Sequence, residues 1–351
     1  MLRKAPELIF RRYVLSVLRR PIGTLRPNQV DQVVVLAGIW DYPALTDHLV
    51  ALRRRGVHVT QVIYDLIPLR KPQFCSDGQV DRFGTWLERT PEYAWSYITI
   101  SDYVRHDLLN YLEERGLKRP VAAIPLAHEL RVAANEGYPS IPAALAQQPY
   151  ALCVGTIEVR KNHLSLCRAW EALLHRHPSR VPLLAIAGKW GWKCDELRAY
   201  LARTNFLDGN IVIIESASDQ ALHRLYSNAL FCVFPSKAEG WGLPVGEAAW
   251  CGTPTVFSRS TSLVEILPPG VADMFDPDDP QDMLRVLESY IADPRVREEA
   301  RERLKCINLR TWSDVGDDYA QHLMCEKLTA ERQMADLGRG RREAGASALA
   351  S

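Results

Sequence analysis

The chain has 351 residues, of which 47% are hydrophobic and 24% are charged, a composition typical of a soluble globular protein with two domains. Lys and Arg number 43 against 42 Asp and Glu, so no charge excess indicates nucleic acid, and we expect no nucleic-acid partner. No apolar run approaches the ~20 residues of a transmembrane helix and no signal peptide is recognisable, so we expect a cytoplasmic protein. The eight cysteines are scattered without metal-ligand spacing, which predicts reduced, buried thiols and no metal site.

Residues 1–30 form a distinct basic segment. Six basic residues face one acid, Glu7, within residues 1–20, and apolar residues alternate with them. This pattern predicts an amphipathic helix, which could lie peripherally on the inner face of the cytoplasmic membrane. Alternatively, the helix packs on the first domain with its arginines in water.

Residues 31–147 alternate strand-like and helix-like patterns, which predicts a first α/β domain with a parallel sheet. Ser101 has the position of an N-cap, and Gly116 that of a helix stop. The expected strands are 32–37, 57–63, 97–100 and 121–124, and the expected helices are 42–55, 82–93 and 101–115. Residues 64–71 are expected to form a loop, and the proline-containing stretch 129–149 a linker with the domain boundary near Gln147.

Residues 148–312 repeat the alternation and predict a second α/β domain. A helix at 313–328 should follow and cross back to the first domain, and the tail 329–351 has the composition of a disordered segment. The expected strands are 150–154, 183–186, 211–214, 229–234, 255–257 and 273–275. The expected helices are 163–175, 222–227, 244–250 and 281–293.

The stretch 229–254 is the most informative part of the chain. An apolar strand leads into a loop with Glu239, and a short helix opened by Pro244 and closed by Gly252 carries Glu247. Open α/β sheets bind ligands at the carboxyl ends of their strands, where this loop lies. Unpaired buried carboxylates are costly, so we expect these two glutamates in a binding crevice and not in the core.

The stretch 155–162, Gly-Thr-Ile-Glu-Val-Arg-Lys-Asn, joins a strand to a helix. It places Arg160 and Lys161 beside the amide groups of a helix N-terminus, where anions bind. Arg can hold two phosphate oxygens and Lys adds a mobile charge, so the segment suits a diphosphate. The alternative is a basic first turn of an ordinary helix.

Both stretches resemble a known family. Glu239 and Glu247, in the setting Phe-Pro-Ser-x-x-Glu-Gly-x-Gly-Leu-Pro, resemble the E-x7-E signature of glycosyltransferase family 4, and 155–162 resembles that family's G-T-x-E-x-R-K-N string. The resemblance implies the GT-B fold, in which two Rossmann-like domains with parallel sheets face a central cleft. It also implies a retaining enzyme that uses a nucleotide-diphosphate sugar and requires no cofactor.

The resemblance also implies roles for individual residues. The donor diphosphate and nucleotide would be bound by the glycines and cations of the two strings and by Glu247, which would accept the ribose hydroxyls; the residues are Gly155, Thr156, Arg160, Lys161, Gly240, Gly242, Leu243 and Glu247. Glu239 would face the sugar and support positive charge on its ring. Asp219 would border the base, or simply be an acid in the first turn of a helix.

The first domain departs from the family's pattern. It is short and lacks the usual glycine-rich loop, and Tyr64 stands where many relatives have a His. Asp65 is therefore a second catalytic candidate, on the acceptor side, with a helix-capping role as the alternative. His128 could replace the missing imidazole, although a loop His is more often solvated.

The expected function is hexosyl transfer to a glycan or lipid-linked acceptor in polysaccharide or lipopolysaccharide biosynthesis. Mannose, with GDP-mannose as donor, is favoured because 183–192 resembles a segment seen in mannosyltransferases. Two rival enzymes of the same fold are disfavoured. A nucleotide-sugar epimerase lacks the E-x7-E string, and a phosphorylase needs a pyridoxal lysine site that this sequence does not show. A non-catalytic or truncated nucleotide-binding subunit remains the alternative.

Overall fold

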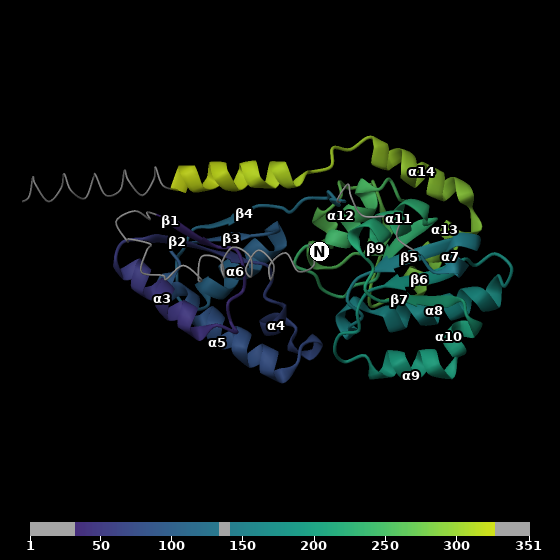
Figure 1. Cartoon of the computed structure of the whole chain (residues 1–351), viewed down its shortest axis with the longest axis horizontal. Coiled ribbons are helices and arrows are strands. Elements are labelled where there is room, and N and C mark those ends of the chain that lie inside the picture. Colours follow the sequence, from purple (N-terminus) through teal and green to yellow (C-terminus); the bar gives the residue numbers. More distant parts are fainter. Residues whose placement is uncertain (1–31, 133–140, 327–351) are drawn as a thin grey trace, which may run out of the picture.

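The computed structural model describes residues 32–132 and 141–326. The basic segment 1–30 and the tail 329–351 lie outside the described residues, as do part of the linker and the end of the predicted last helix. The described residues form two α/β halves, which lie side by side along the long axis of the molecule (Figure 1).

The first half has one parallel sheet of four strands in the order β1-β2-β3-β4. Its strands are β1 (Gln32–Val35), β2 (His58–Ile63), β3 (Ser96–Thr99) and β4 (Val121–Ala123). Its helices are α3 (Pro43–Arg54), α4 (Ile67–Arg70), η5 (Pro72–Phe74), α5 (Asp77–Tyr93) and α6 (Asp102–Glu113). The expected strands are confirmed, and Ser101 caps α6 as predicted, since its side chain accepts a hydrogen bond from the amide of Val104. The stretch 64–71, expected to be a loop, contains the short helix α4.

The second half has a parallel sheet of six strands in the order β10-β9-β8-β5-β6-β7. The strands are β5 (Tyr150–Val154), β6 (Leu183–Ala187), β7 (Ile211–Ile214), β8 (Phe231–Phe234), β9 (Thr255–Ser258) and β10 (Asp273–Phe275). The helices are α7 (Ala143–Gln147), η6 (Val159–Lys161), α8 (His163–Arg176), α9 (Asp195–Arg203), α10 (Asn205–Asp208), α11 (Asp219–Asn228), α12 (Leu243–Trp250), η7 (Thr261–Glu265), α13 (Pro280–Ala292) and α14 (Pro294–Lys305). The predicted strands are all present, so the predicted α/β class with two parallel sheets is confirmed.

Strand side chains alternate between separate apolar layers. In β5, Leu152 and Val154 belong to a cluster that also includes Val62 and Ile98 of the first sheet. The intervening Cys153 faces a second cluster, which is formed within the second half by α8, α9 and α13. A third cluster packs α3, α5 and α6 against the first sheet. The two halves therefore share one continuous apolar core and each has a second core of its own.

A helix over residues 312–326 leaves the second half and lies along the first sheet (yellow in Figure 1). Its Tyr319 and Leu323 pack on the shared apolar cluster. Near its end, Glu326 accepts a hydrogen bond of 3.1 Å from Thr60 in β2. This helix therefore ties the two halves together.

All eight cysteines lie in the described part of the chain, and none of them forms a disulfide. Five are buried and Cys251 is partly buried, but Cys306 and Cys325 are exposed. The prediction of reduced thiols is consistent with this, whereas the prediction that the thiols are buried is wrong for these last two. None of the described helices is both long and apolar enough to span a membrane.

Candidate active site

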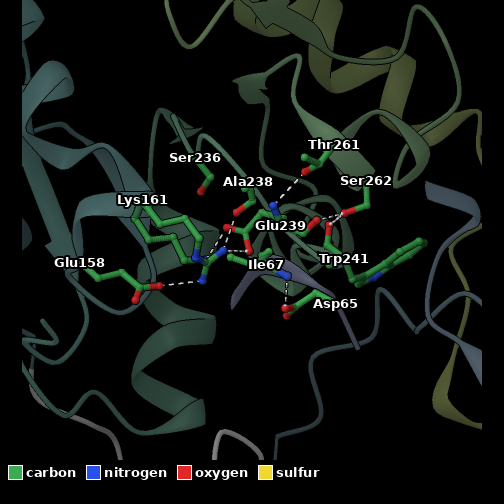
Figure 2. Close-up of polar contacts among 12 residues, drawn as sticks. Asp65, Ile67, Glu158, Lys161, Ser236, Ala238, Glu239, Trp241, Thr261 and Ser262 are labelled. Carbon is green, nitrogen blue, oxygen red and sulfur yellow. Dashed lines mark hydrogen bonds and ion pairs between the residues drawn. The ribbon is translucent and has the colours of Figure 1, made fainter. Parts of the chain in front are cut away.

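Glu239 lies at the centre of a charged cluster between the two halves (Figure 2). Arg160 Nη1 is 2.6 Å from Glu239 Oε2, and Lys161 Nζ is 2.5 Å from Glu239 Oε1. The other arm of Arg160 binds the buried Glu158, with 2.6 Å between Nη2 and Oε1. The structure thus brings the predicted sugar-facing glutamate together with both predicted diphosphate-binding cations.

The position of these residues follows from the second sheet. Both β5 and β8 run parallel in its centre, so the segments that follow them emerge at the same edge. Arg160 and Lys161 lie on the 3-10 turn η6 after β5, before α8 begins at His163, and therefore not in the first turn of the α-helix. The backbone amide of Lys237, in the loop after β8, donates to Arg160 O at 2.9 Å and joins the two loops.

Glu239 is only 7% exposed, which differs from the expectation that it would not be buried. Burial raises the pKa of its carboxyl group, but Lys161, Arg160 and Ser236 outweigh that effect and hold the pKa at about 2. Its charge is therefore retained in the interior because two cations neutralise it. Burial lowers the pKa of Arg160, but Glu239 and Glu158 outweigh burial and raise it above its ordinary value.

The pairing of Glu239 with two cations makes the stability of the fold depend on pH. Because the pKa of Glu239 falls from 4.5 to about 2 on folding, the pair stabilises the protein above pH 4.5 and loses that contribution as pH falls toward 2. We expect Glu239→Gln to lower the free energy of unfolding by about 3 kcal/mol at pH 7 and by much less near pH 3. Urea unfolding of both proteins at each pH measures this, and a pH-independent difference would contradict it.

Asp65 reaches the same place from the first half. Asp65 and Glu239 line one pocket of about 10 Å³, together with residues of α4, α6 and η7. The Asp65 side chain accepts a hydrogen bond of 2.9 Å from the amide of Ile67, so it caps the start of α4 while it faces the pocket. Burial raises its pKa, and Arg160 partly opposes this. Both roles considered for Asp65 are thus compatible with its position.

Three positions at this site require glycine, two because backbones approach closely and one because of its backbone conformation. A Cβ at Gly240 would lie 2.1 Å from the carbonyl oxygen of Tyr64 in the first half. Gly242 precedes α12 with φ of 107°, a conformation that favours glycine. Gly188, which the sequence did not single out, packs so closely that its Cβ would lie 1.7 Å from Gly155 O.

We expect Gly240→Ala to lower the free energy of unfolding by about 1–3 kcal/mol, because backbone atoms have to move to admit the methyl group. The matched control is Gly84→Ala within α5, where a Cβ meets nothing within 4 Å, so helix propensity should make the change stabilising. Chemical denaturation measures both effects. Equal effects of the two substitutions would contradict the close approach seen at Gly240.

The remaining predicted donor residues lie directly after β5 and on α12. Gly155 is buried at the end of β5, Thr156 is exposed, and Leu243 begins α12. Glu247 is half-buried on α12, where it accepts a hydrogen bond of 2.9 Å from the hydroxyl group of Tyr226. Asp219 lies in the first turn of α11, as its helix-acid alternative predicted.

Two residues of the first half are engaged with the backbone. The Tyr64 hydroxyl donates to Leu36 O, and burial raises the pKa of Tyr64. His128 is buried, with Nε2 2.8 Å from Ile266 O and Nδ1 2.8 Å from the amide of Arg310. Both ring nitrogens are therefore occupied, so His128 is neither solvated nor available to a substrate, and the expectation that it replaces the missing imidazole is wrong.

Sequence reasoning missed three polar residues that hold Glu239 in place. Thr261 Oγ1 accepts from the amide of Glu239 at 2.8 Å, and Ser262 Oγ donates to its carbonyl oxygen at 2.8 Å (Figure 2). Glu158 orients Arg160. Thr261 and Ser262 lie some twenty residues after the Glu239 loop, and no sequence spacing predicts that η7 contacts it. Of the three residues, only Glu158 could have been predicted from the sequence, because it lies within the stretch 155–162.

Comparison with known proteins identifies part of the chain. Residues 139–306 match the family described as "Glycosyl transferases group 1". The chain is 28% identical over 293 residues to "Serotype-specific mannosyltransferase WbdA" of Escherichia coli, covering 80% of this chain and 35% of that protein. It is 30% identical over 228 residues to "O-antigen chain mannosyltransferase B" of Escherichia coli, covering 62% of this chain and 57% of that protein. The chain thus spans between about a third and just over half of the length of these relatives.

Solved structures share the fold. HepE of Anabaena, solved in complex with UDP and glucose, aligns with a TM-score of 0.66 at 14% identity, covering 89% of this chain and 81% of that one. A trehalose 6-phosphate synthase of Burkholderia multivorans aligns with a TM-score of 0.63 at 16% identity, covering 91% and 75%. The two parallel sheets together with these neighbours confirm the predicted GT-B fold. Residues 139–306 therefore match the glycosyl transferases group 1 family, within a chain of GT-B fold.

Proposed function

We propose that this protein is a retaining hexosyltransferase that transfers a sugar, with mannose favoured, from a nucleotide-diphosphate sugar to a glycan or lipid-linked acceptor. The observation that carries the proposal is the convergence of Arg160 and Lys161 on Glu239 at the carboxyl edge of the second sheet. The relatives named as O-antigen mannosyltransferases support mannose and polysaccharide biosynthesis. HepE, whose structure holds UDP and glucose, supports a nucleotide-sugar donor.

In this proposal the donor diphosphate replaces Glu239 as the partner of Arg160 and Lys161. Breaking the bond between the anomeric carbon and the diphosphate places negative charge on the leaving phosphate and positive charge on the sugar ring. Arg160 and Lys161 turn to the phosphate and stabilise its charge, which is usually the largest contribution at such sites. Glu239, released from both cations, faces the sugar ring and stabilises its positive charge.

The other residues position the reactants. Glu247 accepts hydrogen bonds from the ribose hydroxyls, while Gly155, Thr156, Gly240, Gly242 and Leu243 line the nucleotide and the sugar. Asp65 lines the pocket beside Glu239 from the first half, where it accepts the proton of the acceptor hydroxyl. Its raised pKa favours that role, because a stronger base accepts a proton more readily. Residues 1–20 would hold the enzyme near a lipid-linked acceptor at the cytoplasmic membrane.

Turnover of defined donors tests the proposal. The protein is incubated with GDP-mannose, UDP-glucose and ADP-glucose and with lipid-linked or oligosaccharide acceptors. Released nucleoside diphosphate is measured, and proton NMR reports the anomeric configuration of the product. We expect release from GDP-mannose and an α-linked product; inversion would exclude the retaining mechanism.

A non-catalytic nucleotide-binding subunit is the second candidate. Tyr64, which stands where many relatives of the resembling family have a His, is hydrogen-bonded to the backbone. Such a subunit would bind a nucleotide without releasing product from any donor.

A further inference from the structure

The 3-10 helix η7 (Thr261–Glu265) contacts both halves of the molecule. At its start, Thr261 and Ser262 bind the two backbone polar groups of Glu239, each at 2.8 Å. Ser262 is fully buried, and its hydroxyl also lies 3.3 Å from Trp241 O. The backbone of the Glu239 loop is therefore fixed by η7.

At its other end, η7 reaches the first half. The carboxylate of Glu265 accepts hydrogen bonds from the amides of Asp102 at 2.7 Å and Tyr103 at 2.6 Å, at the start of α6. The next amide, Val104, donates to Ser101 Oγ at 3.2 Å. The first amides of a helix lack partners within it, and its N-terminus attracts negative charge, so a carboxylate suits this position.

A second contact joins the same helix end to the Glu239 loop. The Ser101 hydroxyl donates to Gly240 O at 2.9 Å, and this side chain is fully buried. The N-terminus of α6 therefore touches the residue after Glu239 directly, and it touches η7 through Glu265.

The pocket beside Glu239 is too small for a sugar while these contacts are made. It is lined by Asp65, Arg70 and Tyr103 of the first half and by Glu239 and Thr261 of the second, and it measures about 10 Å³. A volume of this size holds about one water molecule. A sugar can reach Glu239 from this side only if α4 and α6 move away from the second half.

We propose that Glu265 is a positioning residue that couples closure of the two halves to the placement of Glu239. When the first half closes, α6 docks its N-terminal amides on Glu265 and its Ser101 on Gly240. Because Thr261 and Ser262 lie in the same short helix as Glu265, this docking fixes the Glu239 backbone beside Asp65. The kinetic part of this proposal rests on the function proposed above.

The test compares Glu265→Ala and Glu265→Gln with Asp293→Ala. Asp293 caps α14 by accepting from the amide of Arg295, and α14 has 12 residues, as α6 does. The control therefore removes a carboxylate cap from a helix of equal length within the second half. Three quantities are measured for each protein: kcat, the affinity for nucleoside diphosphate, and the radius of gyration by small-angle X-ray scattering.

We expect Glu265→Ala to lower kcat about tenfold or more, as the loss of charge-assisted hydrogen bonds does. Nucleoside-diphosphate affinity should stay within about twofold of wild type, because the proposed phosphate-binding residues all lie in the second half. The radius of gyration of Glu265→Ala should increase. Glu265→Gln should give an intermediate kcat because one acceptor oxygen remains. Asp293→Ala should match wild type in all three quantities.

A wild-type kcat in Glu265→Ala would overturn the proposal. Equal losses of kcat and nucleotide affinity would also overturn it, because they indicate that the substitution disturbs the whole fold. If the wild-type protein turns over no donor, the proposed function fails, and scattering alone decides the coupling. Expansion of Glu265→Ala relative to Asp293→Ala then supports closure through Glu265, and coincident profiles overturn it.

Discussion

Glu239→Gln is expected to lower kcat about 1,000-fold and to leave a folded protein that still binds nucleoside diphosphate. The substitution keeps the size of the side chain but removes the negative charge that supports the positive sugar ring, and losses of this order follow removal of one stabilising group at a reacting centre. Because the glutamate also competes for Arg160 and Lys161, its removal frees both cations for phosphate. Nucleotide affinity should therefore be equal or higher.

Turnover and calorimetry on the same preparation measure the two effects separately. Glu298→Gln is the control, since Glu298 pairs with Arg301 at the surface of α14. Exposed pairs contribute little to stability, so this variant should match wild type. Turnover of Glu239→Gln within about tenfold of wild type would remove Glu239 from the chemistry.

Lys161→Ala is expected to weaken nucleoside-diphosphate binding about 100-fold, because a charge-assisted bond to phosphate is lost in a largely buried site. The companion Arg160→Ala is a less specific test, since Arg160 also binds Glu158 and the carbonyl oxygen of Ala238. It should reduce both affinity and stability.

Isothermal titration of Lys161→Ala and of Lys305→Ala measures the effect. Lys305 is an exposed lysine on α14 that pairs with Glu302, so its loss should leave affinity unchanged. Equal affinities of wild type and Lys161→Ala would contradict the assignment of Lys161 to the phosphate.

Local sequence signals predicted most of the fold. Short, mainly apolar runs located every described strand of both sheets, because buried parallel strands carry few polar residues. The Ser101 cap was also predicted correctly, since its capping bond is made within three residues. Helices α9 and α14 were missed: their exposed faces are highly charged, and no glycine marks their ends. In α10, Phe206 and Leu207 adopt positive φ values, which no apolar periodicity encodes.

The site was predictable only in part. Position and charge selected Glu239 and, separately, Arg160 and Lys161, and the resemblance to glycosyltransferase family 4 implied that they share one site; the structure brings the three together. That the three neutralise one another could not be predicted, because the pairing depends on how the loops after β5 and β8 meet. The contact between Glu265 and α6 joins residues more than 160 positions apart through backbone amides, which carry no sequence signature.

The central claim is that the edge of the second sheet binds a nucleoside diphosphate through Lys161 and Arg160. Titration calorimetry of the 351-residue chain with GDP, UDP and ADP tests it most directly. We predict that one of the three, with GDP favoured, binds stoichiometrically and that Lys161→Ala weakens this binding about 100-fold. No binding of any of the three, or binding that Lys161→Ala leaves unchanged, would contradict the claim.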